Sequence, residues 1–422
     1  MTTRSLRELS CADDYDPDSM PVAKAREFIQ AYLTPIAGTE KVNIRAALGR
    51  VLAEDIVSRI NVPSHVNSAM DGYAVSFKDL NMQGETMLRM IGTALAGKPF
   101  AGQVSDQQCV RIMTGGVLPE GTDTVIMQEH ASADGQNIRF SGAHKQGQNI
   151  RQAGEDLATG QVVLKTGKYI RPAELGLIAS LGIAEITVRR RLRVAFFSTG
   201  DELRSIGSPL EEGKIYESNR YTLHGMLTRL GAEVLDMGVV KDDPASLEQA
   251  LSEAAVTADV VITSGGVSVG EADYIKELLS RLGEVVFWKI AMKPGRPLAY
   301  GKIGRAHFFG LPGNPVSVMV TFYQFAREAL LILMGRNQDI AVPVLKVTCA
   351  SALKKAPGRT EFQRGILSQD ANGVWSVRVT GEQGSGILRS MSEANCFIIL
   401  PESQGNVSPG TLVEVQVLDG LV

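Results

Sequence analysis

Between Arg193 and Met334 the hydrophobic and polar positions follow two alternating periods. Short apolar runs such as 260–262 have the length of buried strands, and between them apolar residues recur at helical spacing, as in 275–282. Repeated units of this kind predict a mostly parallel sheet with helices on both faces. The predicted strands lie at 194–197, 233–235, 260–262 and 285–288, a hairpin joins 298–300 to 307–309, and the predicted helices lie at 219–230, 246–255, 275–282 and 318–334.

The segments on either side carry other patterns. Residues 76–147 contain short alternating strands with frequent glycine, which predict a small β-rich domain. Residues 336–422 contain five strand-like pieces, which predict a small barrel or sandwich; they lie at 344–347, 361–365, 375–379, 396–400 and 412–417. Nearer the N-terminus, helices are predicted at 22–33, 44–52 and 172–181, with a strand at 54–58, after a polar lead-in, 1–20, that we expect to be flexible.

Composition narrows the classes of function. The chain has 422 residues, 44% of them hydrophobic, and its net charge of -3 argues against a general binder of nucleic acid or membrane surfaces. The four cysteines, at 11, 109, 349 and 396, form no CxxC pair, so neither structural zinc nor a disulfide framework is expected. The first 18 residues lack the apolar core of a secretory signal, and no unbroken apolar run reaches the roughly 18 residues of a membrane span. We therefore expect a cytoplasmic protein.

A glycine-rich turn follows the apolar run 260–262. Strand, glycine turn and helix form the layout in which backbone N–H groups and a helix N-terminus bind phosphate. Asp273, directly after the turn, is suited to hold a divalent cation against phosphate oxygens. The alternative is an ordinary turn in which Asp273 is favoured by the helix dipole. The candidate turn residues are Ser264, Gly265, Gly266, Val267, Ser268 and Gly270.

Other polar loops also follow predicted strands. Ligands of open parallel sheets bind at the carboxyl ends of the strands, and the loops 198–202, 242–243, 264–273 and 312–315 all occupy such positions. A further loop, 293–297, adds two cations. Carboxylates, glycine turns and cations at one sheet edge indicate a polyanionic substrate with a bridging metal. Asn67, Ser68 and Asp71 cluster on another loop, for which a plain Asp-Gly turn is the alternative.

No arrangement for nucleophilic catalysis is evident. The five histidines, at 65, 130, 144, 224 and 307, show no metal-ligand spacing, so a structural role is expected for each. Lys354, Lys355, Arg359 and Arg364 make the first half of the last domain basic, and a solvated face is the alternative explanation for them.

Seven motifs in a fixed order make the chain recognisable. Over about residues 21–420 it resembles the molybdopterin molybdenumtransferase family, the group of MoeA and the gephyrin E domain. The motifs are NSAMDGYA at 67–74, RIMTG at 111–115, GED at 154–156, FSTGDEL at 197–203, TSGGVSVGEADY at 263–274, KPGRP at 293–297 and LPGNPVS at 311–317.

This resemblance implies an elongated multidomain subunit of α/β and β domains. After the lead-in, 1–20, the expected parts are a linking domain at 21–60 and 148–185, a β-rich insert at 61–147, a MogA-like doubly wound α/β domain at 186–335 and a C-terminal β-barrel at 336–422. It also implies a homodimer in which each site lies between the α/β domain of one subunit and the insert of the other.

The implied substrates are adenylylated molybdopterin and molybdate: AMP leaves, with Mg²⁺ as cofactor, and molybdenum is placed on the dithiolene. The resemblance assigns catalytic roles to Asp71, Thr114, Asp156, Glu202, Asp242 and Asp273, of which Glu202, Asp242 and Asp273 would hold the metal. Besides the turn residues above, the substrate-binding set is Ser198, Thr199, Gly200, Pro312, Gly313, Asn314 and Pro315, and the molybdate-binding set is Lys293, Arg296, Arg364 and Ser385. Arg296 stands where the family often has lysine, and the match around Ser385 is looser.

Two other functions are alternatives. One is molybdopterin adenylylation, the preceding step, although the linking, insert and barrel domains argue against it. The other is a scaffold or receptor-binding role of the gephyrin type, although the intact acidic set Asp71, Glu202, Asp242 and Asp273 argues that chemistry is retained. A transient contact with the adenylylating protein of the pathway is a further expectation; neither nucleic acid nor membrane is expected as a partner.

Overall fold

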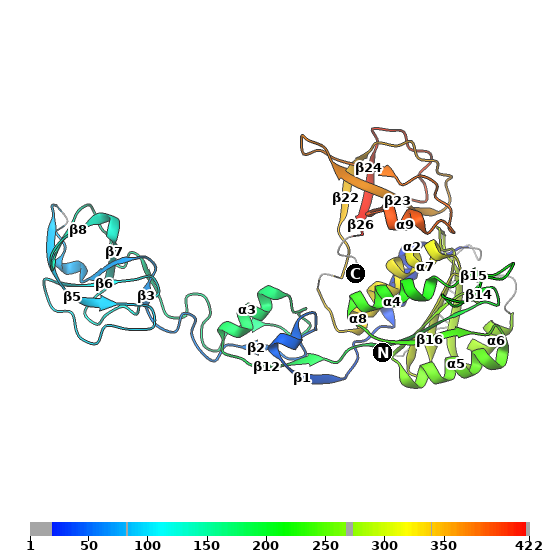
Figure 1. The fold of residues 1–422 in the computed structure, drawn as a ribbon, viewed down its shortest axis with the longest axis horizontal. Coiled ribbons are helices and arrows are strands. Elements are labelled where there is room, and N and C mark those ends of the chain that lie inside the picture. The colour runs from blue at the N-terminus through cyan, green and yellow to red at the C-terminus, as the bar shows by residue number, and fades with distance from the viewer. Residues whose placement is uncertain (1–18, 82, 267–272, 339, 419–422) are drawn as a thin grey trace.

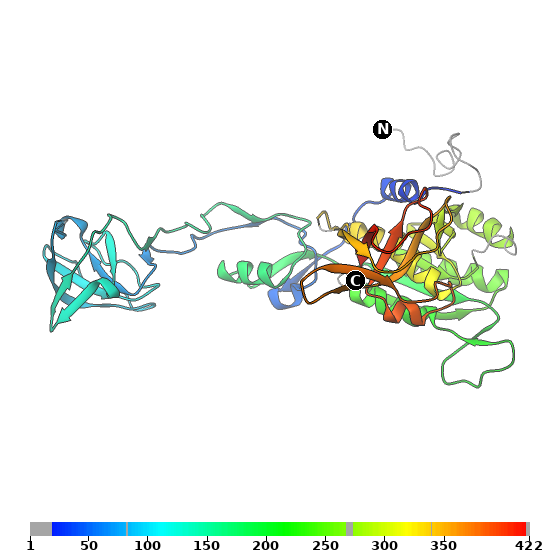
Figure 2. The same cartoon turned by 90° about the horizontal axis from the view of Figure 1, so that it is seen from above.

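The computed structural model describes residues 19–81, 83–266, 273–338 and 340–418, without the side chains of residues 273–276 and 287. The molecule is elongated: a β-rich insert lies at one end, a slender linking region in the middle, and an α/β domain with a barrel beside it at the other end (Figures 1 and 2). The expected fold class is confirmed.

The α/β domain is built on a six-stranded sheet with the order β16-β13-β17-β21-β20-β18. The first four strands are parallel, and β20 runs antiparallel to both of its neighbours. The predicted hairpin is therefore β20–β21. The strands are β13 (Arg193–Thr199), β16 (Glu233–Val240), β17 (Val260–Ser264), β18 (Gly283–Lys289), β20 (Pro297–Ile303) and β21 (Ala306–Leu311).

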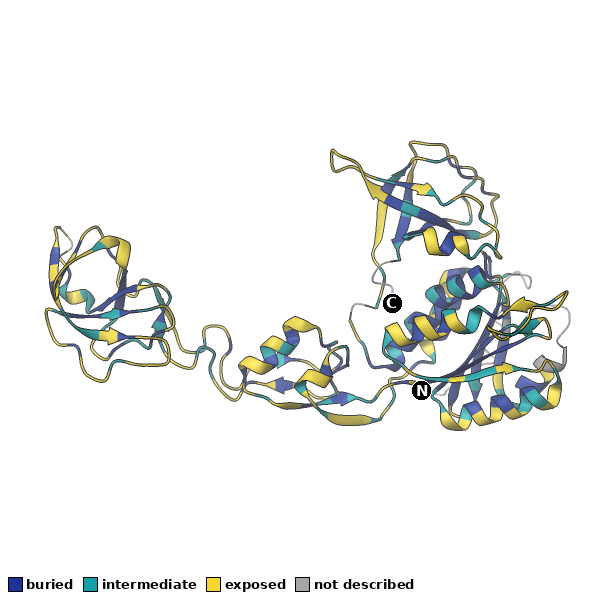
Figure 3. Cartoon of the chain, viewed as in Figure 1, coloured by how far each residue is buried: buried dark blue, intermediate teal, exposed yellow. Residues whose placement is uncertain are grey.

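Helices cover both faces of this sheet because successive strand residues point to opposite sides. On β13, Val194 and Phe196 pack with α4 (Asn219–Leu230) and the helix formed by α7 (Pro315–Thr321), the π-turn Phe322–Ala326 and α8 (Arg327–Leu333). Ala195 and Phe197 pack on the other face with α5 (Pro244–Thr257) and α6 (Asp273–Leu282). In Figure 3 the buried strands lie between helices whose outer faces are exposed.

The helix Pro315–Leu333 is, by length and composition alone, apolar enough to cross a membrane, with a mean hydropathy of 1.4. Of its apolar window, 78% is buried inside the protein, where it packs beneath the sheet. Its apolar character is therefore explained by its place in the core of the α/β domain.

The linking region is formed by two separate chain segments. β1 (Thr39–Asn43) pairs with β12 (Glu185–Arg189), and β2 (Ile56–Val57) pairs with β11 (Val162–Leu164), around helix α3 (Pro172–Ser180). The predicted helix at 44–52 is wrong beyond a short 3₁₀ turn, Ile44–Ala47. Gly49 takes a positive φ of 75°, and Val51 and Leu52 then form β-bridges.

Helix α2 (Val22–Ala31) does not pack in the linking region. Its apolar face, Val22, Ala25 and Ile29, lies in the same hydrophobic cluster as the α/β sheet. The family resemblance placed this helix, as part of 21–60, in the linking domain. The domain boundaries themselves stay a prediction.

The insert contains a six-stranded sheet with the order β7-β4-β6-β5-β9-β8. Its strands are β4 (Gly72–Val75), β5 (Thr86–Ala94), β6 (Gln108–Ile112), β7 (Thr124–Met127), β8 (Ala131–Asp134) and β9 (Asn137–Phe140), with 3₁₀ turns at Phe77–Asp79 and Gln128–His130. β3 (Asn67–Ser68) pairs with β10 (Ile150–Arg151) where the chain enters and leaves the insert.

The C-terminal domain is a closed five-stranded barrel. Its strands are β22 (Val344–Cys349), β23 (Thr360–Gln369), β24 (Trp375–Val379), β25 (Cys396–Leu400) and β26 (Leu412–Val417), with a short helix, α9 (Arg389–Glu393). Pairing of β23 with both β24 and β25 closes the ring. The short strand β19 (Met292–Lys293) leaves the α/β domain and joins β23, so a backbone ladder connects the two domains.

Candidate functional site

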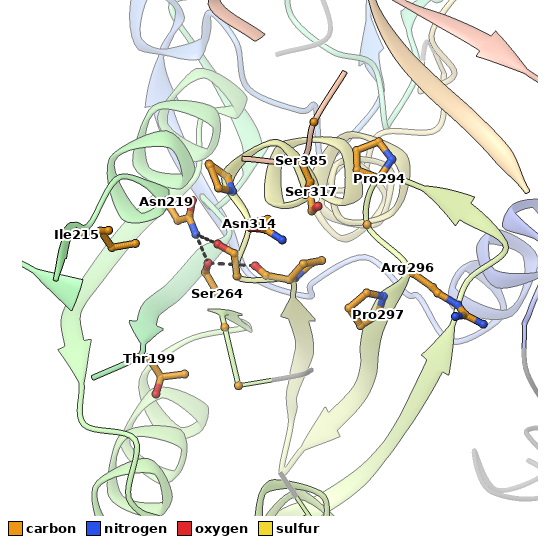
Figure 4. A pocket seen from close by; sticks show the side chains of 18 of the residues that line it. Thr199, Ile215, Asn219, Ser264, Pro294, Arg296, Pro297, Asn314, Ser317 and Ser385 are labelled. Carbon is orange, nitrogen blue, oxygen red and sulfur yellow. Dashed lines mark hydrogen bonds between the residues drawn. The ribbon is translucent and has the colours of Figure 1, made fainter. Parts of the chain in front are cut away.

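A cavity of about 700 Å³ lies where the carboxyl ends of the α/β strands face the barrel. Figure 4 shows that its wall is built from several elements, among them the segments of Thr199, Asn219, Ser264, Arg296 and Ser385. The predicted site residues on this wall are Thr199, Gly200, Glu202, Asp242, Ser264, Gly265, Gly266, Lys293, Arg296, Pro312, Gly313, Asn314, Pro315 and Ser385.

The glycine turn begins directly after β17 and has a backbone that requires glycine. Gly265 and Gly266 have positive φ values of 90° and 69°. A Cβ atom on Gly265 would lie 2.5 Å from the carbonyl oxygen of Thr199. The backbone of this turn therefore packs directly on the end of β13, and no side chain separates it from the cavity.

Asn219 ties together two of the loops that line the cavity. Its Nδ2 donates to Ser264 Oγ at 2.9 Å and to the carbonyl oxygen of Gly313 at 2.7 Å. Ser264 Oγ in turn donates to the carbonyl oxygen of Pro312 at 3.3 Å. Figure 4 shows the bonds around Ser264 at the centre of the wall. The first turn of α4 thus fixes the loops that follow β17 and β21.

Ser198 does not line the cavity. Its side chain is buried, and its Oγ donates to Oε1 of the buried Glu217 at 3.0 Å. The same Oε1 accepts the backbone N–H of Arg220 at 2.7 Å, so Glu217 caps the start of α4. Through its contact with Glu217, Ser198 stabilises the end of β13, so its role is structural.

Two carboxylates line one side of the cavity. Glu202 follows β13, Asp242 follows β16, and both are exposed. Thr199 Oγ1 donates to Asp242 Oδ1 at 3.3 Å. Within the described residues there is no cluster of three or more His, Cys, Asp or Glu that could hold a metal. Two carboxylates and a hydroxyl are nevertheless oxygen donors of the kind that bind Mg²⁺ together with substrate phosphates. The donor set therefore fits Mg²⁺.

The cations lie toward the other side of the sheet. Lys293 ends the short strand β19, Arg296 lies on the loop between β19 and β20, and Arg359 comes from the barrel. In the sheet, β17 and β21 separate β13 from β20. Three strand spacings amount to about 14 Å. The cavity therefore has an acidic side and a basic side, with the glycine turn and the 312–315 loop between them.

Arg364 and Ser385 occupy different positions. Ser385 lines the cavity, whereas Arg364 is buried in the barrel. Arg364 donates from Nε to Ser390 Oγ and from Nη2 to the carbonyl oxygen of Gly384, both at 3.0 Å. Burial of the side chain lowers the pKa of Arg364 to about 10. Arg364 thus carries a buried positive charge directly behind the loop that bears Ser385.

Asp71 and Thr114 are brought together, but in the insert. Asp71 Oδ1 accepts both the backbone N–H and the Oγ1 hydroxyl of Thr114 at 2.8 Å. These hydrogen bonds, more than the charge of Arg111, lower the pKa of Asp71. The insert lies at the far end of the molecule from the cavity (Figure 1). Asp156, exposed on the loop after β10, is also away from the cavity.

Some predicted residues lie outside the described part of the chain. These are Val267, Ser268 and Gly270 and the side chain of Asp273, whose backbone begins α6.

Sequence reasoning missed several cavity residues, notably Asn219, Arg359 and Gln383. Asn219 has the sequence signature of a helix cap, and its amide contacts were not visible from that pattern. Arg359 lies in a basic run that a solvated face explains equally well. For Gln383, the sequence offers only its position close to Ser385, in the segment that matches the family loosely.

Known protein families match this chain along most of its length. Three family models match successive parts of the chain: "MoeA N-terminal region (domain I and II)" over residues 20–182, "Probable molybdopterin binding domain" over 195–331 and "MoeA C-terminal region (domain IV)" over 346–418. Together they include the α/β sheet, the insert and the barrel.

Curated relatives match over most of their length. A molybdopterin molybdenumtransferase of Haemophilus influenzae is 48% identical over 91% of this chain and 95% of its own. One from Nostoc is 34% identical, covering 88% and 87%. Gephyrin of Dictyostelium discoideum is 32% identical over 89% of this chain but 59% of its own. The crystal structure of the molybdopterin biosynthesis moeA protein from Pyrococcus horikoshii matches with a TM-score of 0.82 and 31% identity, covering 95% of this chain and 100% of the other.

Proposed function

Since this chain belongs to the molybdopterin molybdenumtransferase family, we propose that it inserts molybdenum from molybdate into adenylylated molybdopterin and releases AMP. In this reaction water cleaves the pyrophosphate link between the pterin phosphate and AMP, so that AMP leaves, and the two dithiolene sulfurs replace two oxygen ligands of molybdate, which leave as water. Both substrates are anions, and one of them also carries a neutral heterocycle.

The observation that carries this proposal is the division of one cavity into an acidic and a basic side. Glu202 and Asp242 line the side at β13 and β16, whereas Lys293 and Arg296 line the side at β20. A small oxyanion is attracted to the basic side, and a metal-bound pyrophosphate is suited to the acidic side. Both reactants would then lie in one cavity of about 700 Å³, on either side of the glycine turn.

We assign Mg²⁺ to Glu202 and Asp242, with Asp273 as a third ligand from the start of α6. When bound, Mg²⁺ neutralises charge that develops as the pyrophosphate link breaks. The chain's own groups do the rest. Gly265 and Gly266 have positive φ values and carry no side chain, so their backbone would let a phosphate approach closely. Asn219 holds the loops at Ser264 and Gly313 in register.

The oxyanion is assigned to Lys293, Arg296 and Ser385, with Arg364 behind them. A guanidinium offers a fixed fork of donors for an oxyanion. The buried charge of Arg364 acts on the loop of Ser385 through its hydrogen bond to Gly384.

The same proposal makes the protein a homodimer with shared sites. Asp71 and Thr114 form an ordered pair on the insert, remote from the cavity of their own chain (Figure 1). A second copy that places its insert against this cavity would bring Asp71 and Thr114 to the substrate.

We place the protein in the cytoplasm, in keeping with the free, buried Cys109, Cys349 and Cys396.

The alternatives remain testable. Adenylylation of molybdopterin would need only the α/β domain. The curated molybdenumtransferases match nearly the whole chain, which favours the molybdenum-insertion reaction. The match to gephyrin suggests a scaffold role as the second alternative. Such a role would not need the carboxylates Glu202 and Asp242, which this chain retains at the cavity.

The decisive experiment supplies purified protein with adenylylated molybdopterin, molybdate and Mg²⁺ and measures AMP. We expect AMP release that needs both molybdate and the divalent metal and stops with EDTA. Asp242→Asn should lower the rate by at least about 100-fold, since a metal ligand is lost. Adenylylated product formed from ATP and molybdopterin would instead identify an adenylyltransferase. Absence of AMP under every metal condition would leave the scaffold role.

A further inference from the structure

Arg111 is an arginine of the insert that the assignments above do not use. It lies on β6, directly opposite Tyr73 on β4. Its Nη1 donates to the Tyr73 hydroxyl at 3.1 Å, and its Nη2 donates to Gln128 Oε1 at 3.0 Å. The guanidinium carbon lies 5.5 Å from the centre of the Tyr73 ring, and Tyr73 itself is buried. The sheet therefore holds this guanidinium in one orientation.

Arg111 shares one end of the insert sheet with Asp71 and Thr114. Asp71 precedes β4, Thr114 lies just after β6 and Gln128 follows β7, and these three strands are neighbours. The backbone N–H of Gln128 donates to the carbonyl oxygen of Asp71 at 3.1 Å. Hydrogen bonds from Thr114 lower the pKa of Asp71, and the charge of Arg111 lowers it further. A carboxylate, a hydroxyl and a guanidinium are thus presented together at one edge of the insert.

The guanidinium of Arg111 keeps donors for a ligand. An arginine side chain has five N–H groups. Among the described residues, Tyr73 and Gln128 accept one each, so five less two, or three, remain. Within the same part of the chain, no carboxylate lies at ion-pair distance from Arg111. Arg111 is therefore oriented by neutral groups, and its charge is available to an anion.

The cavity in the α/β domain lacks a cation on one side. Among the described residues of its wall, the lysines and arginines are Lys293, Arg296 and Arg359, which lie on the basic side. On the acidic side, the same described wall presents two carboxylates and no lysine or arginine. A phosphoanhydride there would have no charged side chain to bind its oxygens, which arginine does well. In the dimer proposed above, the insert that brings Asp71 to this cavity also brings Arg111.

Resting on the proposed function, we propose that Arg111 is a substrate-binding residue that the insert of one subunit places at the acidic side of the other subunit's cavity, where it binds the phosphate that leaves as AMP. Water cleaves the P–O–P link, and the guanidinium stabilises the negative charge that forms on the departing phosphate oxygen. Arg111 stays protonated and transfers no proton. Because Thr114 holds Asp71, the carboxylate and the guanidinium remain separate, and each can meet its own ligand.

The test uses the full chain and measures AMP release and equilibrium binding of AMP. Arg111→Gln should lower kcat/KM for adenylylated molybdopterin about 10- to 100-fold and weaken AMP binding about tenfold, because charged hydrogen bonds are lost. The KM for molybdate should not change, since molybdate is assigned to the other side of the cavity. Arg111→Lys keeps the charge without the fork and should recover part of the loss. Arg139→Gln is the matched control and should behave as the wild type: Arg139 is an exposed arginine of the insert, on β9, two strands from β6, and pairs with Glu85.

Mixed dimers test from which subunit Arg111 acts. Arg111→Gln and Asp242→Asn alter opposite partners of a shared site, so their mixture should recover AMP release to about a quarter of the wild-type rate. Arg111→Gln and Asp71→Ala both alter the insert, so their mixture contains no intact site and should gain nothing over Arg111→Gln alone. The opposite pattern would overturn the placement of Arg111 at the partner's cavity.

The remaining outcomes separate this role from a structural one and from the proposed function. Gln128→Leu, at an exposed position, removes one support of Arg111 and should also lower AMP release, which keeps the test open if Arg111→Gln folds poorly. A lowered Tm with normal AMP binding in Arg111→Gln would mean that Arg111 only supports Tyr73, and would overturn the proposal, as would wild-type release and binding. If the wild type releases no AMP, the proposed function fails. Weaker AMP binding by Arg111→Gln than by Arg139→Gln would then still support the phosphate contact.

Discussion

At the scale of single residues, the glycine turn makes the sharpest demand on the sequence. Gly265 combines a φ of 90° with a backbone oxygen 2.5 Å from where a Cβ would lie. Gly207, on the loop after β14 (Leu203–Arg204), has a φ of 83° but no heavy atom within 4 Å of such a Cβ. Comparing substitutions at the two positions therefore separates the energetic cost of a positive φ from the cost of steric crowding.

We predict that Gly265→Ala destabilises the α/β domain several times more than Gly207→Ala. The positive φ alone costs about 1 kcal/mol, and forcing Thr199 away adds about 2 kcal/mol more. For a domain of this size, that corresponds to a fall in Tm of roughly 2–4 °C for Gly207→Ala and about three times as much for Gly265→Ala. Thermal melts of the two variants check the difference. Equal shifts would mean that the turn moves aside without cost.

Residues also show where sequence reasoning stops. The carboxylates and glycines of the strand-end loops could be predicted because strand ends of a parallel sheet meet at one edge. Asn219 could not, because its role depends on the distance from Nδ2 to Gly313, 94 positions along the chain.

At the scale of elements, local sequence patterns predicted where the strands lie better than they predicted which strands pair with each other. All five barrel strands were predicted from strand-like pieces of the sequence, yet the closing pair β23–β25 and the joining strand β19 depend on long-range pairing. The same limit applies to α2, whose apolar face suits the linking region and the α/β sheet equally well by pattern. Only the packed structure selects the sheet.

Helix α3 offers an element-scale prediction of pH dependence. Glu174 accepts hydrogen bonds from the side chain and the backbone N–H of Arg171, with Lys168 Nζ at 3.5 Å. Chiefly through the Arg171 side chain, these contacts lower the pKa of Glu174 from 4.5 to about 2. Because the folded pKa lies below the unfolded one, the stabilisation is complete above about pH 4.5 and is lost as the pH falls toward 2.

We therefore expect Glu174→Gln to destabilise the linking region at pH 7 by about 1–2 kcal/mol, a value reduced because Arg171 is half exposed. The difference in Tm between variant and wild type should shrink as the pH falls below 4.5. Glu185→Gln is the matched control: Glu185 pairs with Lys41 at the surface, and the pair should contribute little. A difference that stays constant from pH 7 to pH 3 would contradict the assigned role of Glu174.

At the scale of the whole molecule, the elongated shape has a functional consequence. The insert, which carries the Asp71–Thr114 pair, and the α/β domain, whose strand ends line the cavity, lie at opposite ends of the molecule, with the two-segment linking region between them (Figure 2). Exposed apolar side chains on that region, such as Leu48, Val57 and Ile60, are available to a second copy. The resemblance predicts that the motifs at 67–74 and 111–115 serve the same chemistry as the α/β loops of a second subunit, and the distance between the two ends of one chain is consistent with that prediction.

The shared-site arrangement can be decided by mixing inactive subunits. Asp71→Ala removes the insert carboxylate, and Asp242→Asn removes a cavity carboxylate, so each homodimer should be inactive. If every site combines the insert of one subunit with the cavity of the other, a mixed dimer has one site with both defects and one intact site. Random re-association makes half of the dimers mixed, so the AMP-release rate should recover to about a quarter of the wild-type value. Different affinity tags on the two variants verify the mixed dimers. Verified mixed dimers without activity would contradict the shared site, because a site confined to one chain is damaged in every subunit of the mixture.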